Sequence, residues 1–326
     1  MKIFFYFLRE FDELPICRRI SKQMNIEFDY TTEYPTLENS ILAKGFDAVS
    51  TTPCDMGAAM LERFHELGVK YIGTRSIGYD HIDMKRAKEL GMRLSHVTYP
   101  ADGVADFTIM LMLMALRKMP HIMKRSDVQD YGLRGKMGHD LNTCTVGIVG
   151  LGSIGCAVAK RLEGFGCRIL GTSRTVKEIP GIEYTDFDTL LAESDIITLH
   201  MDSNSTNYHM IDKASIRKMK SGSILVNTAR GRLIDTDALI EALESGHIKA
   251  AALDLMENEN GLYYYDRMGD VIDNHQMAIL RSFPNVILSP HVAFYTEENV
   301  EWMVRGAFES VAAFEAGNPT DLEVGI

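Results

Sequence analysis

Three side chains that could together reduce a carbonyl group follow one another in the C-terminal half of the sequence. They are Arg230, Glu259 and His291, separated by 259 − 230 = 29 and 291 − 259 = 32 residues. A guanidinium fork can hold a carboxylate through two hydrogen bonds. An imidazole can donate a proton near neutral pH, and a neighbouring carboxylate stabilises its protonated form. A 2-keto acid, with a carboxylate beside its carbonyl, is the substrate that this set suits.

A glycine-rich motif upstream of these residues provides a second chemical signal. Its residues, in order, are Gly150, Gly152, Ser153, Ile154 and Gly155. The apolar run 144–149 precedes the motif, and a helical pattern over 154–165 follows it. Glycines at this spacing permit a tight turn from strand to helix and a close approach of the backbone to a pyrophosphate, which the start of the helix then faces. The motif therefore predicts a dinucleotide cofactor.

The residues after the next predicted strand bear on which nicotinamide cofactor is used. Sites for NAD carry an acidic residue there, which binds the ribose hydroxyls. This chain instead has Ser173, Arg174 and Thr175, beginning 173 − 155 = 18 residues after the last glycine. A guanidinium between two hydroxyls suits a 2′-phosphate, so we expect NADPH to be preferred over NADH. The alternative is that Arg174 is a solvated cation and that both cofactors are accepted.

Two series of strand and helix patterns must position these groups. Short apolar runs alternate with helical patterns over 2–97 and again over 144–289, which indicates an α/β fold with two parallel-sheet domains. The segment 296–316 has helical spacing and no strand partner, so we assign it to the N-terminal domain. The expected division is a substrate domain at 1–99 and 297–326, and a dinucleotide-binding domain at 100–296. The predicted strands are 3–8, 46–50, 71–73, 92–96, 144–149, 168–172, 196–200, 223–227, 249–253 and 286–289; the main predicted helices are 56–67, 101–118, 154–165, 235–244 and 296–316; the segment 126–142 is expected to be a loop.

The bulk properties agree with two globular domains and exclude several classes of protein. A chain of 326 residues exceeds what one core usually supports, and 46% hydrophobic residues can fill two. A net charge of −11 argues against a nucleic-acid partner. The apolar runs 3–8 and 109–116 are too short for a signal or a membrane span, so we expect a cytoplasmic protein without a membrane partner. Five cysteines without C-x-x-C spacing indicate neither a disulfide framework nor a metal site.

Four longer motifs are spread over the chain: T-R-S-I-G-Y-D-H-I-D at 74–83, V-G-I-V-G-L-G-S-I-G at 146–155, N-T-A-R-G at 227–231 and S-P-H-V-A-F-Y-T-E at 289–297. Together they resemble the D-isomer-specific 2-hydroxyacid dehydrogenases, most closely the D-lactate dehydrogenases, including the vancomycin-resistance type. The resemblance implies a Rossmann cofactor domain inserted in a flavodoxin-like substrate domain. It also implies a homodimer joined through the cofactor domains, to which the helix at 101–118 contributes.

The same resemblance implies a role for each matching residue. Arg230 would anchor the substrate carboxylate, His291 would donate the proton, and Glu259 would be its partner. Glu259 is chosen over Glu257 because the family's glutamate stands five residues after the aspartate that Asp254 matches. The further residues with implied roles are Ile77, Gly78 and Tyr99 for the substrate, and Thr228 and Asp254 for the cofactor, Asp254 at the nicotinamide amide.

Several alternatives stay open at this point. Pyruvate, reduced to D-lactate, fits the resemblance, but aromatic, branched-chain or other larger 2-keto acids such as phenylpyruvate fit the same catalytic set. The tyrosines at 263–265 either wall the pocket or pack between domains. Asp202 places a negative charge near the adenosine end of the cofactor, and this charge would disfavour binding of a 2′-phosphate. A function of another class is a cofactor-sensing binding protein.

Overall fold

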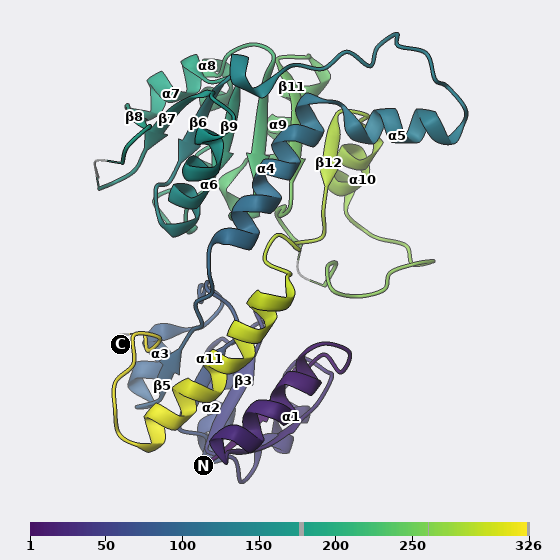
Figure 1. The fold of residues 1–326 in the computed structure, drawn as a ribbon. Coiled ribbons are helices and arrows are strands. Elements are labelled where there is room, and N and C mark those ends of the chain that lie inside the picture. The colour runs from purple at the N-terminus through teal and green to yellow at the C-terminus, as the bar shows by residue number, and fades with distance from the viewer. Residues whose placement is uncertain (176–178, 260, 325–326) are drawn as a thin grey trace. The chain divides into compact units, whose positions relative to one another are not determined.

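The computed structural model describes residues 1–175, 179–259 and 261–324. These residues form two compact units (Figure 1). Unit 1 comprises residues 1–100 and 295–326, and unit 2 comprises residues 101–294. Both sheets consist entirely of parallel strands covered by helices, so the α/β class with two parallel-sheet domains is confirmed.

Unit 1 is a five-stranded sheet in the order β2-β1-β3-β4-β5, the flavodoxin-like order. Successive residues of its strands alternate between two apolar layers. Phe4 packs on the side of α2 and α3, whereas Ile3 and Phe5 pack on the side of α1 and α11. The elements are β1 (Lys2–Phe5), α1 (Glu13–Met24), β2 (Glu27–Tyr30), η1 (Asn39–Ala43), β3 (Ala48–Thr51), α2 (Ala58–Glu66), β4 (Tyr71–Thr74), α3 (Met84–Glu89), β5 (Arg93–Ser95) and α11 (Glu297–Glu315).

Unit 2 is a seven-stranded sheet in the order β12-β11-β10-β9-β6-β7-β8. Counted along the chain within the unit, its first six strands follow the doubly wound order of dinucleotide-binding folds. One apolar layer contains α4 and α6, and the other contains α7, α8, α9 and α10 (Figure 1). The elements are α4 (Asp102–Leu116), α5 (Met119–Asp127), η2 (Leu141–Thr143), β6 (Thr145–Val149), α6 (Ser153–Glu163), β7 (Arg168–Thr172), β8 (Glu183–Tyr184), α7 (Phe187–Glu193), β9 (Ile196–Leu199), α8 (Lys213–Lys218), β10 (Ser223–Asn227), η3 (Gly231–Leu233), α9 (Thr236–Glu244), β11 (Ile248–Leu253), α10 (His275–Ser282) and β12 (Val286–Leu288).

Several local details differ from the sequence-based assignment, which also left out the two-residue strand β8. Strand β2 was not anticipated, because it is a four-residue edge strand with two acidic residues and a half-exposed pattern. The predicted loop 126–142 starts inside α5, which ends at Asp127, and includes the short helix η2. The predicted helix 101–118 corresponds to α4 and is not buried throughout despite its apolar sequence: Met110 on it is 41% exposed, while Val104 and Met112 lie in the core.

None of the helices within the described residues combines the length and the apolar character that crossing a membrane requires.

Candidate active site

The imidazole of His291 pairs with the carboxylate of Glu259. His291 Nδ1 lies 2.9 Å from Glu259 Oε1, and the two side chains are 25% and 23% exposed. Glu259 Oε2 accepts the backbone N–H of Met256 at 3.3 Å, so the carboxylate is held from two directions. With Nδ1 engaged as the donor to a carboxylate, Nε2 is the ring nitrogen left to exchange a proton with a ligand.

The turn that carries His291 is built around the buried side chain of Asp254. Its carboxylate accepts bonds from Ser289 Oγ at 2.6 Å, Val292 N at 3.0 Å and Ala293 N at 2.9 Å. Asp254 is completely buried, and its backbone carbonyl accepts the N–H of His291 at 2.8 Å. His291 adopts a left-handed backbone conformation, with φ 54°. Such a conformation is uncommon for a residue with a side chain and persists where its surroundings enforce it.

Arg230 follows β10 in a turn that Asn227 organises. The buried amide of Asn227 accepts Ala229 N at 3.0 Å and donates to the Arg230 carbonyl at 2.9 Å. Arg230 Nη1 donates to the Ala229 carbonyl at 2.8 Å. The next residue, Gly231, lies against the backbone of Met256, and a Cβ added there would overlap it. The segments that carry Arg230 and Glu259 are therefore in direct backbone contact.

The three candidate catalytic residues all follow the carboxyl ends of neighbouring strands. Arg230 comes after β10, Glu259 after β11 and His291 after β12, and these strands are adjacent in the sheet. In open α/β sheets, ligands bind at this edge. The tertiary structure thus brings the widely spaced set to one side of unit 2.

The glycine-rich turn after β6 has the shape that a pyrophosphate requires. Gly150 has φ 97°, and a Cβ there would overlap the carbonyl of His200. A Cβ at Gly155 would overlap the Gly150 carbonyl, so only glycine fits at both positions. A Cβ at Gly152 would meet no protein atom within 4 Å among the described residues, which leaves space beside the backbone for a ligand.

The start of α6 leaves its N–H groups available to such a ligand. Four other helices of unit 2 begin at a capping side chain, namely Asp186, Asp212, Asp235 and Asn274. Helix α6 begins instead at Gly152, with no side-chain cap, and Ser153 and Ile154 form its first turn. The open space at Gly152 and the uncapped helix start together fit a dinucleotide pyrophosphate.

The residues expected at the ribose end lie at the end of β7. Ser173 Oγ donates to the Thr175 carbonyl at 2.6 Å, and Arg174 and Thr175 are exposed. Asp202 is also exposed, and its backbone carbonyl accepts the amide of Asn207 at 2.7 Å. Each of these charged side chains is therefore open to solvent.

Thr228, another expected cofactor residue, connects β10 to α4. Its hydroxyl lies 2.9 Å from Thr108 Oγ1, which itself donates to the Val104 carbonyl at 2.8 Å. Because the Thr108 hydrogen is used in that bond, Thr228 is the donor between the two hydroxyls. The Thr228 oxygen keeps acceptor capacity, and its side chain is nearly buried.

The expected substrate residues Ile77, Gly78 and Tyr99 lie in unit 1. The carbonyl of Ile77 is 3.0 Å from His96 Nδ1, and the carbonyl of Gly78 accepts Ser76 Oγ at 2.6 Å. Within the described chain, the N–H groups of Ile77 and Gly78 form no hydrogen bond. Two consecutive free backbone donors fit the contribution to a substrate-carboxylate site that the resemblance implies for Ile77 and Gly78.

Two groups of residues near the candidate catalytic set were not assigned by sequence reasoning: it left the role of the tyrosines 263–265 open between two alternatives and gave none to the second group. Tyr264 Oη donates to the His291 carbonyl at 3.0 Å, and the rings of Tyr264 and Phe294 lie 5.8 and 6.1 Å from the His291 ring. The three consecutive tyrosines were the available signal for the first group. The second is a pair of His209 with Glu257, and its only signal was the nearness of Glu257 to Glu259 in the sequence.

Comparison with known proteins gives three consistent results. Residues 109–293 match the family model "D-isomer specific 2-hydroxyacid dehydrogenase, NAD binding domain". A D-specific alpha-keto acid dehydrogenase of Enterococcus faecium is 42% identical over 80% of each chain, and an aromatic 2-oxoacid reductase of Clostridium sporogenes is 38% identical over 97% of this chain and 96% of its own. The crystal structure of a D-lactate dehydrogenase from Treponema pallidum superimposes with a TM-score of 0.89, at 29% identity over 100% of both chains.

Proposed function

The chain belongs to the D-isomer-specific 2-hydroxyacid dehydrogenase family of oxidoreductases, and on this basis we propose that it reduces a 2-oxoacid to the D-2-hydroxy acid. The observation that carries the proposal is the contact of His291 Nδ1 with the Glu259 carboxylate at the sheet edge that also carries Arg230. The dinucleotide, bound at the turn 150–155, would supply a hydride to the carbonyl carbon.

Each of the three residues has a chemical task in this reaction. Arg230 binds the substrate carboxylate and thereby fixes the orientation of the neighbouring carbonyl. His291 donates its Nε2 proton to the carbonyl oxygen as that oxygen gains negative charge. Glu259 stabilises the charged imidazole before the transfer and keeps the ring oriented through Nδ1. The N–H groups of Ile77 and Gly78, together with Tyr99, complete the substrate site in the proposal.

Pyruvate is the substrate that we propose first, with D-lactate as its product. A second candidate is a larger 2-oxoacid such as phenylpyruvate. It is favoured by the aromatic rings of Tyr264 and Phe294 beside His291, since such rings pack well against an aryl side chain. The relative from Clostridium sporogenes is named for aromatic 2-oxoacids, which supports keeping this candidate.

For the cofactor, we propose NADPH in preference to NADH, with both accepted. Ser173 and the exposed Arg174 stand where an acidic residue would repel a 2′-phosphate. The exposed carboxylate of Asp202 acts in the opposite direction and limits the preference.

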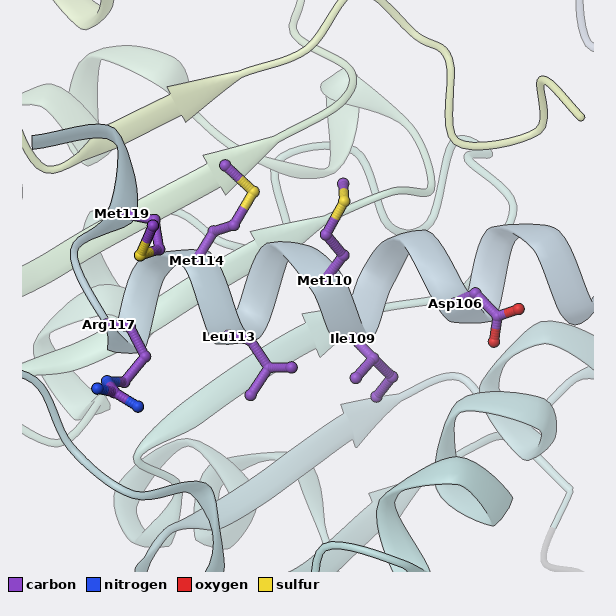
Figure 2. A pocket seen from close by; sticks show the side chains of 7 residues that line it. All are labelled: Asp106, Ile109, Met110, Leu113, Met114, Arg117 and Met119. Atoms are coloured by element: carbon purple, nitrogen blue, oxygen red, sulfur yellow. The ribbon is translucent and has the colours of Figure 1, made fainter. Parts of the chain in front are cut away.

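We further propose that two copies associate through an apolar surface on α4 and α5. A groove of about 470 Å³ lies there and contains none of the candidate catalytic residues; its lining residues are Asp106, Ile109, Met110, Leu113, Met114, Arg117 and Met119 (Figure 2). Met110 and Met114 lie one turn apart on the same side of α4. Further apolar side chains are exposed in α5 and in the segment after it, namely Met123, Val128, Tyr131, Leu133 and Met137. Exposed apolar side chains gathered around a groove are typical of a protein–protein interface.

The proposed activity is tested by initial rates of the purified protein with NADPH and NADH. The substrates are pyruvate, 2-ketobutyrate, 2-ketoisocaproate, phenylpyruvate, 2-ketoglutarate and hydroxypyruvate. We expect turnover of at least one of them, and we expect His291→Ala to lose most of it while the affinity for the cofactor is kept. Tight cofactor binding without turnover of any 2-oxoacid would instead support a cofactor-sensing protein, and unchanged turnover in His291→Ala would remove that residue from the mechanism.

A further inference from the structure

A second imidazole–carboxylate pair lies in the same unit as the pair of His291 with Glu259. His209 Nε2 is 2.8 Å from Glu257 Oε1, and the two side chains are 27% and 13% exposed. Glu257 stands two residues before Glu259, in the same segment after β11. The catalytic roles proposed above use neither member of this second pair.

The backbone of His209 is bound to the segment that follows Arg230. His209 N donates to the Arg232 carbonyl at 2.9 Å, and Ile211 N donates to the Leu233 carbonyl at 3.0 Å. Asp235 N returns a bond to the Ile211 carbonyl at 3.0 Å. The segment 209–211 and the segment 230–235 are thus joined like two short strands.

The side chain of His209 reaches a third segment. Its bond to Glu257 connects these two segments to residues 254–259, which carry Glu259. Gly231 already lies against the Met256 backbone, where no Cβ would fit. The segments 230–235 and 254–259 are therefore connected twice, by backbone contact at Gly231 and by the side-chain pair of His209 with Glu257.

Two further residues, Tyr208 and Arg232, make ring contacts beside the pair. The Tyr208 ring stacks on the His209 ring, with centroids 3.9 Å apart and an interplanar angle of 17°. The Arg232 guanidinium lies 5.5 Å from the centroid of the Tyr208 ring. His209 has φ 51°, a left-handed conformation that is strained for a residue with a side chain. This strain persists because contacts on several sides hold the residue.

We propose that His209 and Glu257 are positioning residues that act as a clamp on Arg230 and Glu259. The clamp fixes the separation between the substrate-carboxylate anchor and the partner of the proton donor, without touching either reactant. This inference rests on the proposed function for its effect on catalysis. Its structural part, the coupling of the segments 230–235 and 254–259, does not depend on that function.

The experiment compares truncating and conservative variants at both positions. His209→Ala and Glu257→Ala remove the bond, whereas His209→Gln keeps a side-chain donor and Glu257→Gln keeps an acceptor oxygen. The matched control is His247→Ala, because His247 Nε2 has a single bond of similar length, 2.8 Å, to the Ile216 carbonyl in the same unit. All variants are measured as the full chain with NADPH and the best 2-oxoacid.

We expect each alanine variant to lose about tenfold to a hundredfold in kcat/KM for the 2-oxoacid, the loss that a misplacement of about 1 Å produces. Cofactor affinity should stay within about twofold, and the glutamine variants should recover most of the activity. The double variant His209→Ala/Glu257→Ala should lose no more than the worse single variant, because both remove one bond. His247→Ala should lower stability only, which separates positioning from general damage.

Unchanged kcat/KM in both alanine variants, or losses that multiply in the double variant, would overturn the clamp. If the unmodified protein reduces none of the 2-oxoacids, the proposed function fails, and the clamp is decided by amide hydrogen exchange. Faster exchange over residues 228–236 and 254–259 together in His209→Ala supports it, and unchanged exchange overturns it. Should an alanine variant not fold, the glutamine variants of the same position are compared by the same exchange measurement.

Discussion

The backbone carbonyl of Asp254 accepts the N–H of His291 at 2.8 Å, while the Asp254 carboxylate binds three donors of the turn 289–293. One completely buried residue at the end of β11 thus shapes the turn after β12 that carries the proposed proton donor. This turn sets the backbone position of His291. The implied contact of Asp254 with a nicotinamide amide stays a prediction beside this role.

Replacing Asp254 by Asn should damage this turn, because an amide NH₂ group cannot accept the N–H bonds of both Val292 and Ala293. We expect a loss of about 1–3 kcal/mol in the free energy of unfolding, the cost of an unsatisfied buried donor, and at least a tenfold fall in kcat. Asp195→Asn is the matched control, since Asp195 accepts a backbone bond from Thr145 at 2.8 Å near the amino ends of β6 and β9. The control should lose stability but keep kcat; equal kcat losses in both variants would refute a specific role of Asp254.

Arg230→Lys should show whether the carboxylate anchor needs a two-pronged donor. A lysine keeps the charge but not the fork, and losing a charge-assisted bond of roughly 1.5–3 kcal/mol corresponds to about tenfold to a hundredfold in kcat/KM. Arg232→Lys, two residues away, is the control and should change kcat/KM much less. The measurement is steady-state kinetics over the 2-oxoacid concentration, and equal kinetics for Arg230→Lys and the unmodified protein would contradict the anchor.

Arg174→Ala tests the proposed preference for NADPH. We expect kcat/KM for NADPH to fall about tenfold, as for the loss of one charge-assisted bond, and the value for NADH to stay nearly constant. Asp202→Asn should shift the ratio the other way, because it removes a negative charge. An equal effect of Arg174→Ala on both cofactors would show that this arginine does not contact a 2′-phosphate.

Charge placed on the apolar surface of α4 should separate the proposed dimer. We expect Met110→Glu, at a position 41% exposed, to convert a dimer to a monomer in light scattering coupled to size exclusion. Lys160→Glu, on the exposed side of α6, is the control for added negative charge on this unit. A monomer before any substitution would exclude the dimer, and an unchanged dimer in Met110→Glu would place its interface elsewhere.

His200 should make the protein less stable in mild acid. Burial lowers the pKa of His200 from 6.5 to about 3, so the unfolded chain binds a proton that the folded chain refuses. Its effect is absent above about pH 6.5, and stability decreases as the pH falls from there toward 3. Urea unfolding followed by circular dichroism at pH 5 and pH 7.5 should show a smaller difference for His200→Gln than for the unmodified protein. The same difference in both would mean that other groups cause the acid sensitivity.

Much of the fold could be predicted from local sequence patterns, and the elements that were missed have local reasons. Strands β7 and β10 have the predicted bounds because continuous apolar runs mark strands buried on both faces. Strand β2 could not be found in this way, since its sequence E-F-D-Y is half exposed at the edge of the sheet. The expected substrate residues of unit 1 came only from the resemblance, because a strand or helix pattern carries no information about which residues contact a substrate.

The sequence by itself determined the α/β class and predicted the glycine turn and the candidates Arg230, Glu259 and His291, because strand runs, glycine spacing and residue chemistry are local properties. Residue chemistry alone did not separate Glu257 from Glu259, and the choice of Glu259 as the partner of His291 came from the resemblance. The tertiary structure contains this pair and also pairs Glu257 with His209, which the sequence did not predict, because His291 lies after β12 and His209 before α8. Such pairings join residues 32 and 48 positions apart, and only the packing of the loops at the edge of the sheet selects among them.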